Sequence, residues 1–257
     1  MGRNLRNRIL STWFKVFVLK KYDLKSRSAD ILGFKVKFFG FKQLSVLFNE
    51  IFISNEYYFK TEKENPYIID CGSNIGMAVI YFKTLYPRSR IVAFEPGEEA
   101  FSCLEENVSN NSLEFIELNN AAVSGEEGEV NFFFDGENLG SLTMSTKEER
   151  MPKQKRIVKS VLLSKIINEE VDFLKMDIEG AELEVIEELS REKKLGFIKQ
   201  MVIEYHHHIS KTTDEFSRIL KYLEDGGFGY HIESPVVPRP LARGQFQDIL
   251  ICAYKKY

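Results

Sequence analysis

Residues 65–257 alternate between short apolar runs and longer segments whose apolar residues recur every three or four positions. A strand buried on both faces is apolar throughout, whereas a helix with one buried face shows the wider spacing. The pattern predicts strands at 67–69, 90–94, 113–118, 172–176, 200–204, 228–232 and 248–254, with an extra strand at 130–134. It predicts helices at 77–86, 98–110 and 181–189, and a fourth opened by the capping-box pair Thr212 and Glu215 and ended by Gly226 and Gly227.

This alternation of strands and helices is typical of a doubly wound, Rossmann-like α/β domain. Its sheet is mostly parallel and carries helices on both faces. Ligands of such sheets bind at the carboxyl ends of the strands, near the point where the strand order reverses. Residues that directly follow each predicted strand are therefore the ones to examine for function.

The region before residue 65 differs from the rest of the chain. We interpret residues 1–64 as an N-terminal extension with helical and strand segments, and residues 65–257 as the main domain. Residues 1–22 carry six basic side chains and no acidic one, and the apolar segment 9–19 predicts an amphipathic helix packed on the domain. Because Trp13, Phe14 and Phe17 lie among lysines and arginines, the alternative is peripheral contact of residues 5–21 with an anionic membrane surface.

Composition narrows the classes of function. The formal net charge is −3 and the basic residues gather only at the N-terminus, which argues against nucleic acid as a partner. Cys71, Cys103 and Cys252 form no CxxC pair, which favours a reducing compartment, hence the cytoplasm. No apolar run reaches the roughly 18 residues that a spanning helix needs, and no signal-peptide cleavage site follows the first apolar segment.

The first strand of the domain ends in Asp70-Cys71-Gly72-Ser73-Asn74-Ile75-Gly76, a loop suited to a nucleoside. Gly72 allows a sharp turn close to a ligand, and Gly76 allows the next helix to lie close to the strand. Asp70 is expected to place a carboxylate at the mouth of the site. Glu95 ends the second strand, where a carboxylate can accept hydrogen bonds from two ribose hydroxyls.

The same loop matches the dinucleotide fingerprint G-x-G-x-x-G poorly. Asn74 stands where its second glycine belongs, and Met77 stands where the third belongs. A diphosphate requires that close backbone approach, whereas S-adenosylmethionine has no phosphate and carries a sulfonium and an ammonium group. The loop therefore favours S-adenosylmethionine, and a nicotinamide-dependent oxidoreductase is the weaker alternative.

Several motifs together resemble the FkbM-like family of S-adenosylmethionine-dependent methyltransferases. The loop after the first strand and Ala93-Phe94-Glu95-Pro96 are similar to the family's first two motifs. The run Lys175-Met176-Asp177-Ile178-Glu179-Gly180-Ala181-Glu182 is closely similar to its K-x-D-x-E-G-x-E signature. The resemblance covers residues from about 50 to about 204. It implies a class I methyltransferase sheet with an antiparallel last strand, and methylation of hydroxyl oxygens on sugars or natural products.

The candidate catalytic residues follow two late strands. Asp177 and Glu179 are expected to face the transferred methyl group and the acceptor, as general base or metal ligand, while Lys175 fits a charge network that caps the strand. His206 follows Glu204 at the end of the fifth strand and is a further candidate base. No metal ligands are assigned, although Asp177, Glu204 and His206 are a set that could meet around one divalent ion.

Weaker signals fall on the surrounding loops. Asn120 and Ala121 are expected to border the adenine, and the pair Gly140-Ser141 to touch the cofactor or the acceptor. Tyr57 and Tyr58 either lie near the acceptor cleft or pack in the core. The sequence thus predicts an S-adenosylmethionine-dependent O-methyltransferase with a small-molecule or glycan acceptor. A non-catalytic nucleotide-binding module and a nucleic-acid methyltransferase stay open as alternatives.

Overall fold

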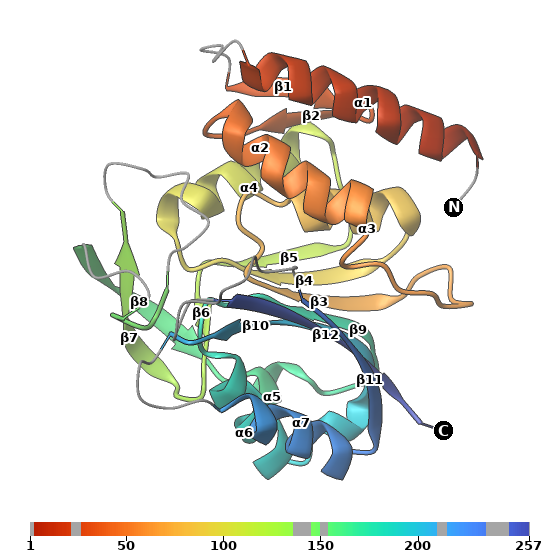
Figure 1. The fold of residues 1–257 in the computed structure, drawn as a ribbon. Helices are drawn as coiled ribbons and strands as arrows, with labels where there is room; N and C mark the ends of the chain where they lie inside the picture. Colours follow the sequence, from red (N-terminus) through yellow and green to blue (C-terminus); the bar gives the residue numbers. More distant parts are fainter. Residues whose placement is uncertain are drawn as a thin grey trace, which may run out of the picture.

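A seven-stranded sheet forms the centre of the computed structural model, which describes residues 3–21, 27–135, 145–149, 154–209, 215–234 and 247–256 (Figure 1). The strand order is β11-β12-β10-β9-β3-β4-β5. The bounds are β3 Tyr67–Cys71, β4 Arg90–Phe94, β5 Ile116–Asn119, β9 Val171–Met176, β10 Ile198–His207, β11 Phe228–Glu233 and β12 Gln247–Lys255. Strands β5, β4, β3, β9 and β10 run parallel, and β12 runs antiparallel to both of its neighbours. The predicted doubly wound sheet with an antiparallel last strand is confirmed.

Helices cover both faces of this sheet (Figure 1). Helices α3 (Met77–Leu85) and α4 (Glu98–Asn110) lie on one face, and α5 (Leu163–Ile166), α6 (Glu182–Arg191) and α7 (Phe216–Asp225) lie on the other. Successive residues of a strand point to opposite faces, so Ile68 and Phe173 join the α3–α4 core while Ile69 and Leu174 join the second core. Burial on both faces explains why these strands are mainly apolar.

A second, three-stranded sheet lies beside the central one (Figure 1). It consists of β6 (Ala122–Val123), β8 (Gln154–Val161) and β7 (Gly128–Phe134), in the order β6-β8-β7. The predicted extra strand is thus present, but in a separate sheet. Its partner β8 was not predicted, because its largely exposed sequence QKRIVKSV offers no continuous apolar run.

The fourth predicted helix begins later than its expected capping box. Helix α7 starts at Phe216, and Thr212 lies outside the described residues. Glu215 occupies the position before the helix, makes no side-chain cap and instead binds the guanidinium of Arg218. The role predicted for Glu215 in a capping box is therefore wrong.

The N-terminal extension packs on the α3–α4 face (Figure 1). It contains α1 (Arg3–Lys21), the hairpin of β1 (Ser28–Ile31) and β2 (Phe34–Lys37), α2 (Phe41–Phe48) and the π-helical segment η1 (Asn49–Ser54). The rings of Phe52 in η1 and Tyr81 in α3 pack edge to face, with their centroids 5.2 Å apart. The ring of Phe59 stacks on that of Phe173 in the sheet, with the centroids 4.4 Å apart. Extension and sheet face share one apolar core. Among the described residues, no helix has the length and apolar character needed to cross a membrane.

Asn107 of α4 and Asn111, the residue that caps the end of this helix, bind the edge strand β2. Asn107 accepts a hydrogen bond from the Lys37 backbone N–H at 2.6 Å and donates to the Lys37 carbonyl at 2.9 Å. Its amide also donates to the Ile75 carbonyl at 2.8 Å, so it joins the extension to the loop after β3 (residues 72–76), the predicted cofactor loop. Asn111 makes the same pair of bonds to Lys35, at 2.7 and 3.0 Å, but is more exposed.

Replacing each asparagine with alanine tests whether burial of the lost hydrogen bonds sets their contribution to the free energy of unfolding. Asn107→Ala leaves buried backbone groups unsatisfied and is expected to lower the free energy of unfolding by about 1–3 kcal/mol for each orphaned group. Asn111→Ala, whose partners can bind water, is expected to cost under about 1 kcal/mol. Urea denaturation at 25 °C measures both. Equal losses would contradict the account.

Candidate cofactor and acceptor site

A cavity opens at the carboxyl ends of β3, β4, β9 and β10, where the fold predicts a ligand. Seven of the ten predicted site residues line it: Gly72, Asn74, Glu95, Ala121, Asp177, Glu179 and His206. Residues of the extension, among them Glu50 and Tyr57, complete its wall. The other three predicted residues, Asp70, Gly76 and Asn120, lie next to the cavity without lining it.

The loops after β3 and β9 touch through their backbones at Gly72. Gly72 has a positive φ of +84°, and a Cβ there would lie 1.7 Å from the carbonyl oxygen of Asp177. The Asp177 backbone N–H donates to the Cys71 carbonyl at 3.1 Å, which fixes this approach. Glycine is therefore required for packing between loops as well as for the turn itself.

The buried ammonium of Lys175 lies beneath this contact. Its Nζ donates to the Gly72 carbonyl at 2.6 Å and lies 3.5 Å from Asp70 Oδ1 and 3.3 Å from Asp177 Oδ2. Burial lowers the pKa of Lys175, but Asp177 and Asp70 outweigh burial and raise the pKa above its ordinary value. The charge network predicted for Lys175 is present.

The structure corrects the expected position of Asp70. Its side chain is fully buried behind the loop, facing Lys175, and does not stand at the mouth of the cavity. Burial raises the pKa of Asp70, while the charge of Lys175 lowers it. Asp70 can thus influence the cavity only indirectly, by holding Lys175, which in turn binds the Gly72 carbonyl.

Glu95 lies at the cavity wall with its carboxylate held by two backbone groups. Oε2 accepts a hydrogen bond from the Asn74 N–H at 2.8 Å, and Oε1 accepts one from the Gly97 N–H at 2.7 Å. Burial raises the pKa of Glu95 to about 7, against the lowering effect of these two donors. Each oxygen keeps a second lone pair, so the fixed carboxylate can accept two further bonds from a ribose diol.

Asn74 and Gly76 shape the loop that Glu95 holds. Asn74 has a left-handed φ of 49°, and its Oδ1 accepts the Ile75 N–H at 2.8 Å and the amide of Gln43 from the extension at 3.3 Å. Gly76 has a φ of +86°, and a Cβ there would lie 2.6 Å from Leu104 Cδ1 of α4. Its close neighbour is thus α4 and not the strand, which corrects the predicted contact.

The two residues expected near the adenine separate in the structure. Ala121 is buried and lines the cavity, whereas Asn120 is exposed. The Asn120 amide donates to the carbonyls of Glu95 and Pro96 at 2.9 and 3.3 Å, so it fixes the loop after β4. Gly140 and Ser141, also expected near a ligand, lie outside the described residues.

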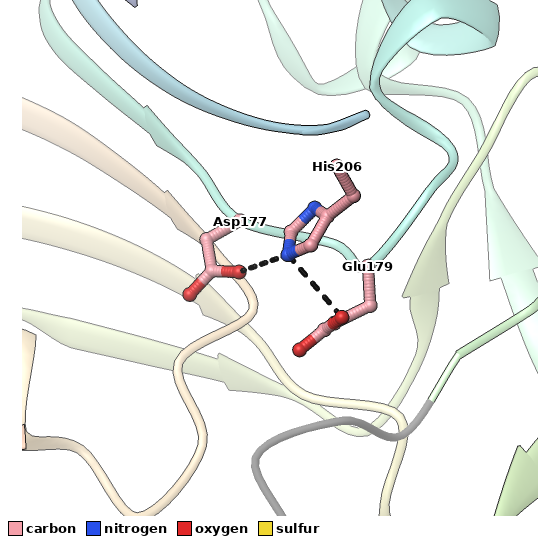
Figure 2. A group of neighbouring side chains, drawn as sticks. All are labelled: Asp177, Glu179 and His206. Carbon is pink, nitrogen blue, oxygen red and sulfur yellow. Dashed lines mark ion pairs between the residues drawn. The ribbon is translucent and has the colours of Figure 1, made fainter. Parts of the chain in front are cut away.

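Asp177, Glu179 and His206 come together on the other side of the cavity (Figure 2). His206 Nε2 lies 3.2 Å from Glu179 Oε2 and 3.8 Å from Asp177 Oδ1, and Nδ1–H donates to the buried Glu182 Oε1 at 2.8 Å. Burial lowers the pKa of His206, but Glu182 and Glu179 outweigh it and raise the pKa well above its ordinary value. The turn that presents Glu179 needs unusual backbone geometry, with φ of 55° at Glu179 and 111° at Gly180.

The extension supplies two residues of the cavity wall: Tyr57, which the sequence placed near the acceptor cleft or in the core, and Glu50, which the sequence analysis did not identify. Tyr57 is buried, and its hydroxyl donates to Asp177 Oδ2 at 3.4 Å and lies 3.5 Å from Glu204 Oε2, so it belongs to both the core and the cavity wall. Tyr58 is exposed. Burial, followed by the charge of Glu56, raises the pKa of Glu50 to about 8. The one available signal was a lone carboxylate in the apolar stretch LFNEIFI.

Comparison with known proteins decides the family. The model of the Methyltransferase FkbM domain matches residues 70–230, more than half of the chain. The chain belongs to the FkbM methyltransferase family. This member is accordingly a methyltransferase, and S-adenosylmethionine is its cofactor, as the sequence predicted. The matched residues include every predicted site residue.

Two sequence relatives of this FkbM chain, and one solved structure similar to it, carry the name methyltransferase. Methyltransferase 1 of Beauveria bassiana is 25% identical over 215 residues, which cover 75% of this chain and 84% of the relative. Methyltransferase sdnD of Sordaria araneosa is 26% identical over 190 residues, covering 62% of this chain and 73% of the relative. A solved structure of Methyltransferase FkbM from Methylobacillus flagellatus KT superposes with a TM-score of 0.48 at 15% identity, covering 96% of this chain and 59% of that chain.

We expect the raised pKa of Glu95, the predicted ribose acceptor, to give cofactor affinity a pH dependence. A neutral Glu95 cannot accept two ribose bonds as strongly, so affinity is full above the pKa of about 7 and falls as pH drops through it. We expect the Kd for S-adenosylmethionine to rise roughly ten-fold between pH 8 and pH 6, as the ionised fraction falls. Calorimetric titration measures this. Glu95→Gln should bind more weakly with a flatter pH profile, and an unchanged profile would show that another group titrates.

Proposed function

We propose that the protein transfers the methyl group of S-adenosylmethionine to a hydroxyl oxygen of a small acceptor, a sugar, glycan or natural product. The observation that carries this proposal is the group formed by Asp177, Glu179 and His206 on the cavity wall. In the reaction, the acceptor oxygen forms a bond to the methyl carbon while the carbon–sulfur bond breaks. The electron pair stays on sulfur, and the hydroxyl proton passes to a base of the site.

The need for a base follows from the chemistry of hydroxyl groups. A neutral hydroxyl is a weak nucleophile, and removal of its proton during attack typically contributes 10²–10⁴-fold to the rate. Asp177 Oδ1 and Glu179 Oε2 lie 3.8 and 3.2 Å from His206 Nε2, so we assign the role of base to the three side chains as a unit. Glu182 supports this role because its bond to Nδ1 turns Nε2 toward the cavity.

The charge of the cavity wall supports a small, uncharged acceptor. Carboxylates of Glu50, Glu179, Glu204 and Asp248 line the cavity together with that of Asp177. Sugar hydroxyls can hydrogen-bond to these acidic side chains whether they are ionised or protonated, whereas the phosphates of a nucleic acid would be repelled by those that are ionised. We therefore propose that nucleic acid is not the acceptor.

His206→Ala tests the proposed chemistry. We expect turnover to fall 10²–10⁴-fold while the Kd for S-adenosylmethionine changes less than two-fold, because His206 lies on the acceptor side. The assay measures S-adenosylhomocysteine formed with a panel of sugars, glycans and polyhydroxylated natural products, and with a structured RNA. His231→Ala, on an exposed position of β11, is the control.

Two results would contradict the proposal. One is methylation of the RNA in preference to every hydroxyl-bearing small molecule, which would show that the acceptor is a nucleic acid and not a small molecule. The other is normal turnover by His206→Ala on an accepted substrate, which would remove the residue from the chemistry.

We further propose that residues 1–64 act as an extension that brings a cytoplasmic enzyme to an anionic membrane surface. One face of α1 buries Ile9 and Val16, while Leu10, Phe14 and Phe17 on the outer face are 50%, 64% and 53% exposed. Exposed cations of the same helix (Arg6, Lys15 and Lys20) accompany these apolar side chains, and α1 contains no acidic residue. Exposed aromatic residues among cations suit the interface of an anionic bilayer.

Vesicle sedimentation tests this membrane contact. We expect the protein to bind vesicles rich in phosphatidylserine, to ignore neutral phosphatidylcholine and to dissociate in high salt. The double variant Phe14→Ser/Phe17→Ser should bind at least ten-fold more weakly. Ile157→Ser, which removes a similarly exposed residue on β8, should bind as the native protein does. Absence of binding to the anionic vesicles would refute the proposal.

A further inference from the structure

We propose that Asp177, Glu179 and His206 bind a divalent cation, of which Mn²⁺ is the best chemical match. This inference deepens the proposed methyl transfer to a hydroxyl and rests on it. One atom from each of the three side chains lies within 4.8 Å of the other two. Figure 2 shows the carboxylates of the segment after β9 and the imidazole of β10 converging on one point.

The distances suit ligands at right angles around one ion. Ligand atoms about 2.1 Å from a metal ion and at right angles lie about 3.0 Å apart. His206 Nε2 lies 3.2 Å from Glu179 Oε2 and 3.8 Å from Asp177 Oδ1. Small rotations of the two partly exposed carboxylates would bring all three atoms to bonding distance.

The imidazole is held in the orientation that metal-binding histidines adopt. Its Nδ1–H donates to Glu182 Oε1 at 2.8 Å, and the side chains of both residues are only 1% exposed. A carboxylate behind a histidine fixes the tautomer that leaves the other nitrogen available to a metal ion. Because His206 is fully buried and so oriented, the site is more than a group of surface acids.

Asp177 is oriented from its other side. Its Oδ2 faces Lys175 Nζ at 3.3 Å and accepts from the Tyr57 hydroxyl at 3.4 Å. Oδ1 is the oxygen turned toward His206. One carboxylate therefore connects the buried lysine of β9, which binds the loop after β3, to the proposed ion.

A second group of possible ligands shares the same nitrogen. Glu204 and Asp248 lie with His206 in another set that could hold a metal ion, and Asp248 Oδ1 is 3.9 Å from Nε2. Burial first, and the neighbouring charge of Asp177 next, raise the pKa of Glu204 well above its ordinary value. A dication would relieve the repulsion among these carboxylates. Glu204 and Asp248 could each supply one further oxygen ligand.

The ligand types favour Mn²⁺. Carboxylate oxygens suit Mg²⁺ and Mn²⁺, whereas an imidazole is a poorer ligand for Mg²⁺, and none of the proposed ligands is a thiolate. An ion here would bind the acceptor oxygen and stabilise its negative charge. Because the three proposed ligands would then hold the ion, the proton would pass to the neighbouring carboxylate of Asp248. The acceptor would then be a hydroxyl able to reach the ion beside the cofactor.

Titration with Mn²⁺ alone tests the site without any acceptor. Full-length protein freed of metal with EDTA is titrated with MnCl₂ while electron paramagnetic resonance reports free Mn²⁺. We expect one site per chain, and at least ten-fold weaker binding for Asp177→Asn, Glu179→Gln and His206→Ala. Glu184→Gln on α6 and His231→Ala on β11 should bind as the native protein does. Circular dichroism shows whether each variant is folded. Glu179→Gln is the mildest change and lies at a partly exposed position, so we expect this variant to fold even if the other two do not.

The outcomes separate this inference from the proposed function. No stoichiometric Mn²⁺ binding, or binding unaffected by Glu179→Gln, would refute the metal site. If S-adenosylmethionine still binds and methyl transfer proceeds in EDTA, the proposed function survives without the ion. Mn²⁺ binding in a protein that methylates no hydroxyl would retain the site and refute the function.

Discussion

The buried ammonium of Lys175 holds together the strand ends on which the site is built. It binds the carbonyls of the cofactor loop and faces the carboxylates of Asp70 and Asp177. Removing one partner of such a buried charge cluster leaves the others uncompensated, at a typical cost of 3–5 kcal/mol. The loop after β3 and the end of β9 are thus fixed relative to each other by one side chain.

The same contact explains how two walls of the cavity come from distant parts of the chain. Gly72 lets the cofactor loop approach the backbone of Asp177, and Asp177 continues to His206 and Glu179. The extension closes the remaining side with Tyr57, which lies between Asp177 and Glu204. Methyl transfer depends on alignment of donor and acceptor, and this arrangement fixes both sides of the cavity before either ligand binds.

Much of this could be predicted from the sequence, because strand burial and loop glycines leave local signals. Apolar runs identified the parallel strands, and polar residues directly after them identified Glu95, Asp177 and His206. Features set by tertiary contacts could not be predicted. The burial of Asp70, the approach of Gly76 to Leu104 and the position of Glu50 in the cavity wall each depend on a partner far away in the chain.

The measurement that tests the central claim most directly is calorimetric titration of the purified protein with S-adenosylmethionine, with NAD as the comparison ligand. The account predicts one molecule of S-adenosylmethionine bound per chain, no heat from NAD, and loss of binding in Gly72→Ala but not in Gly196→Ala, where an added methyl group meets no atom within 4 Å. Equal binding by native protein and Gly72→Ala, or binding of NAD in place of S-adenosylmethionine, would contradict it.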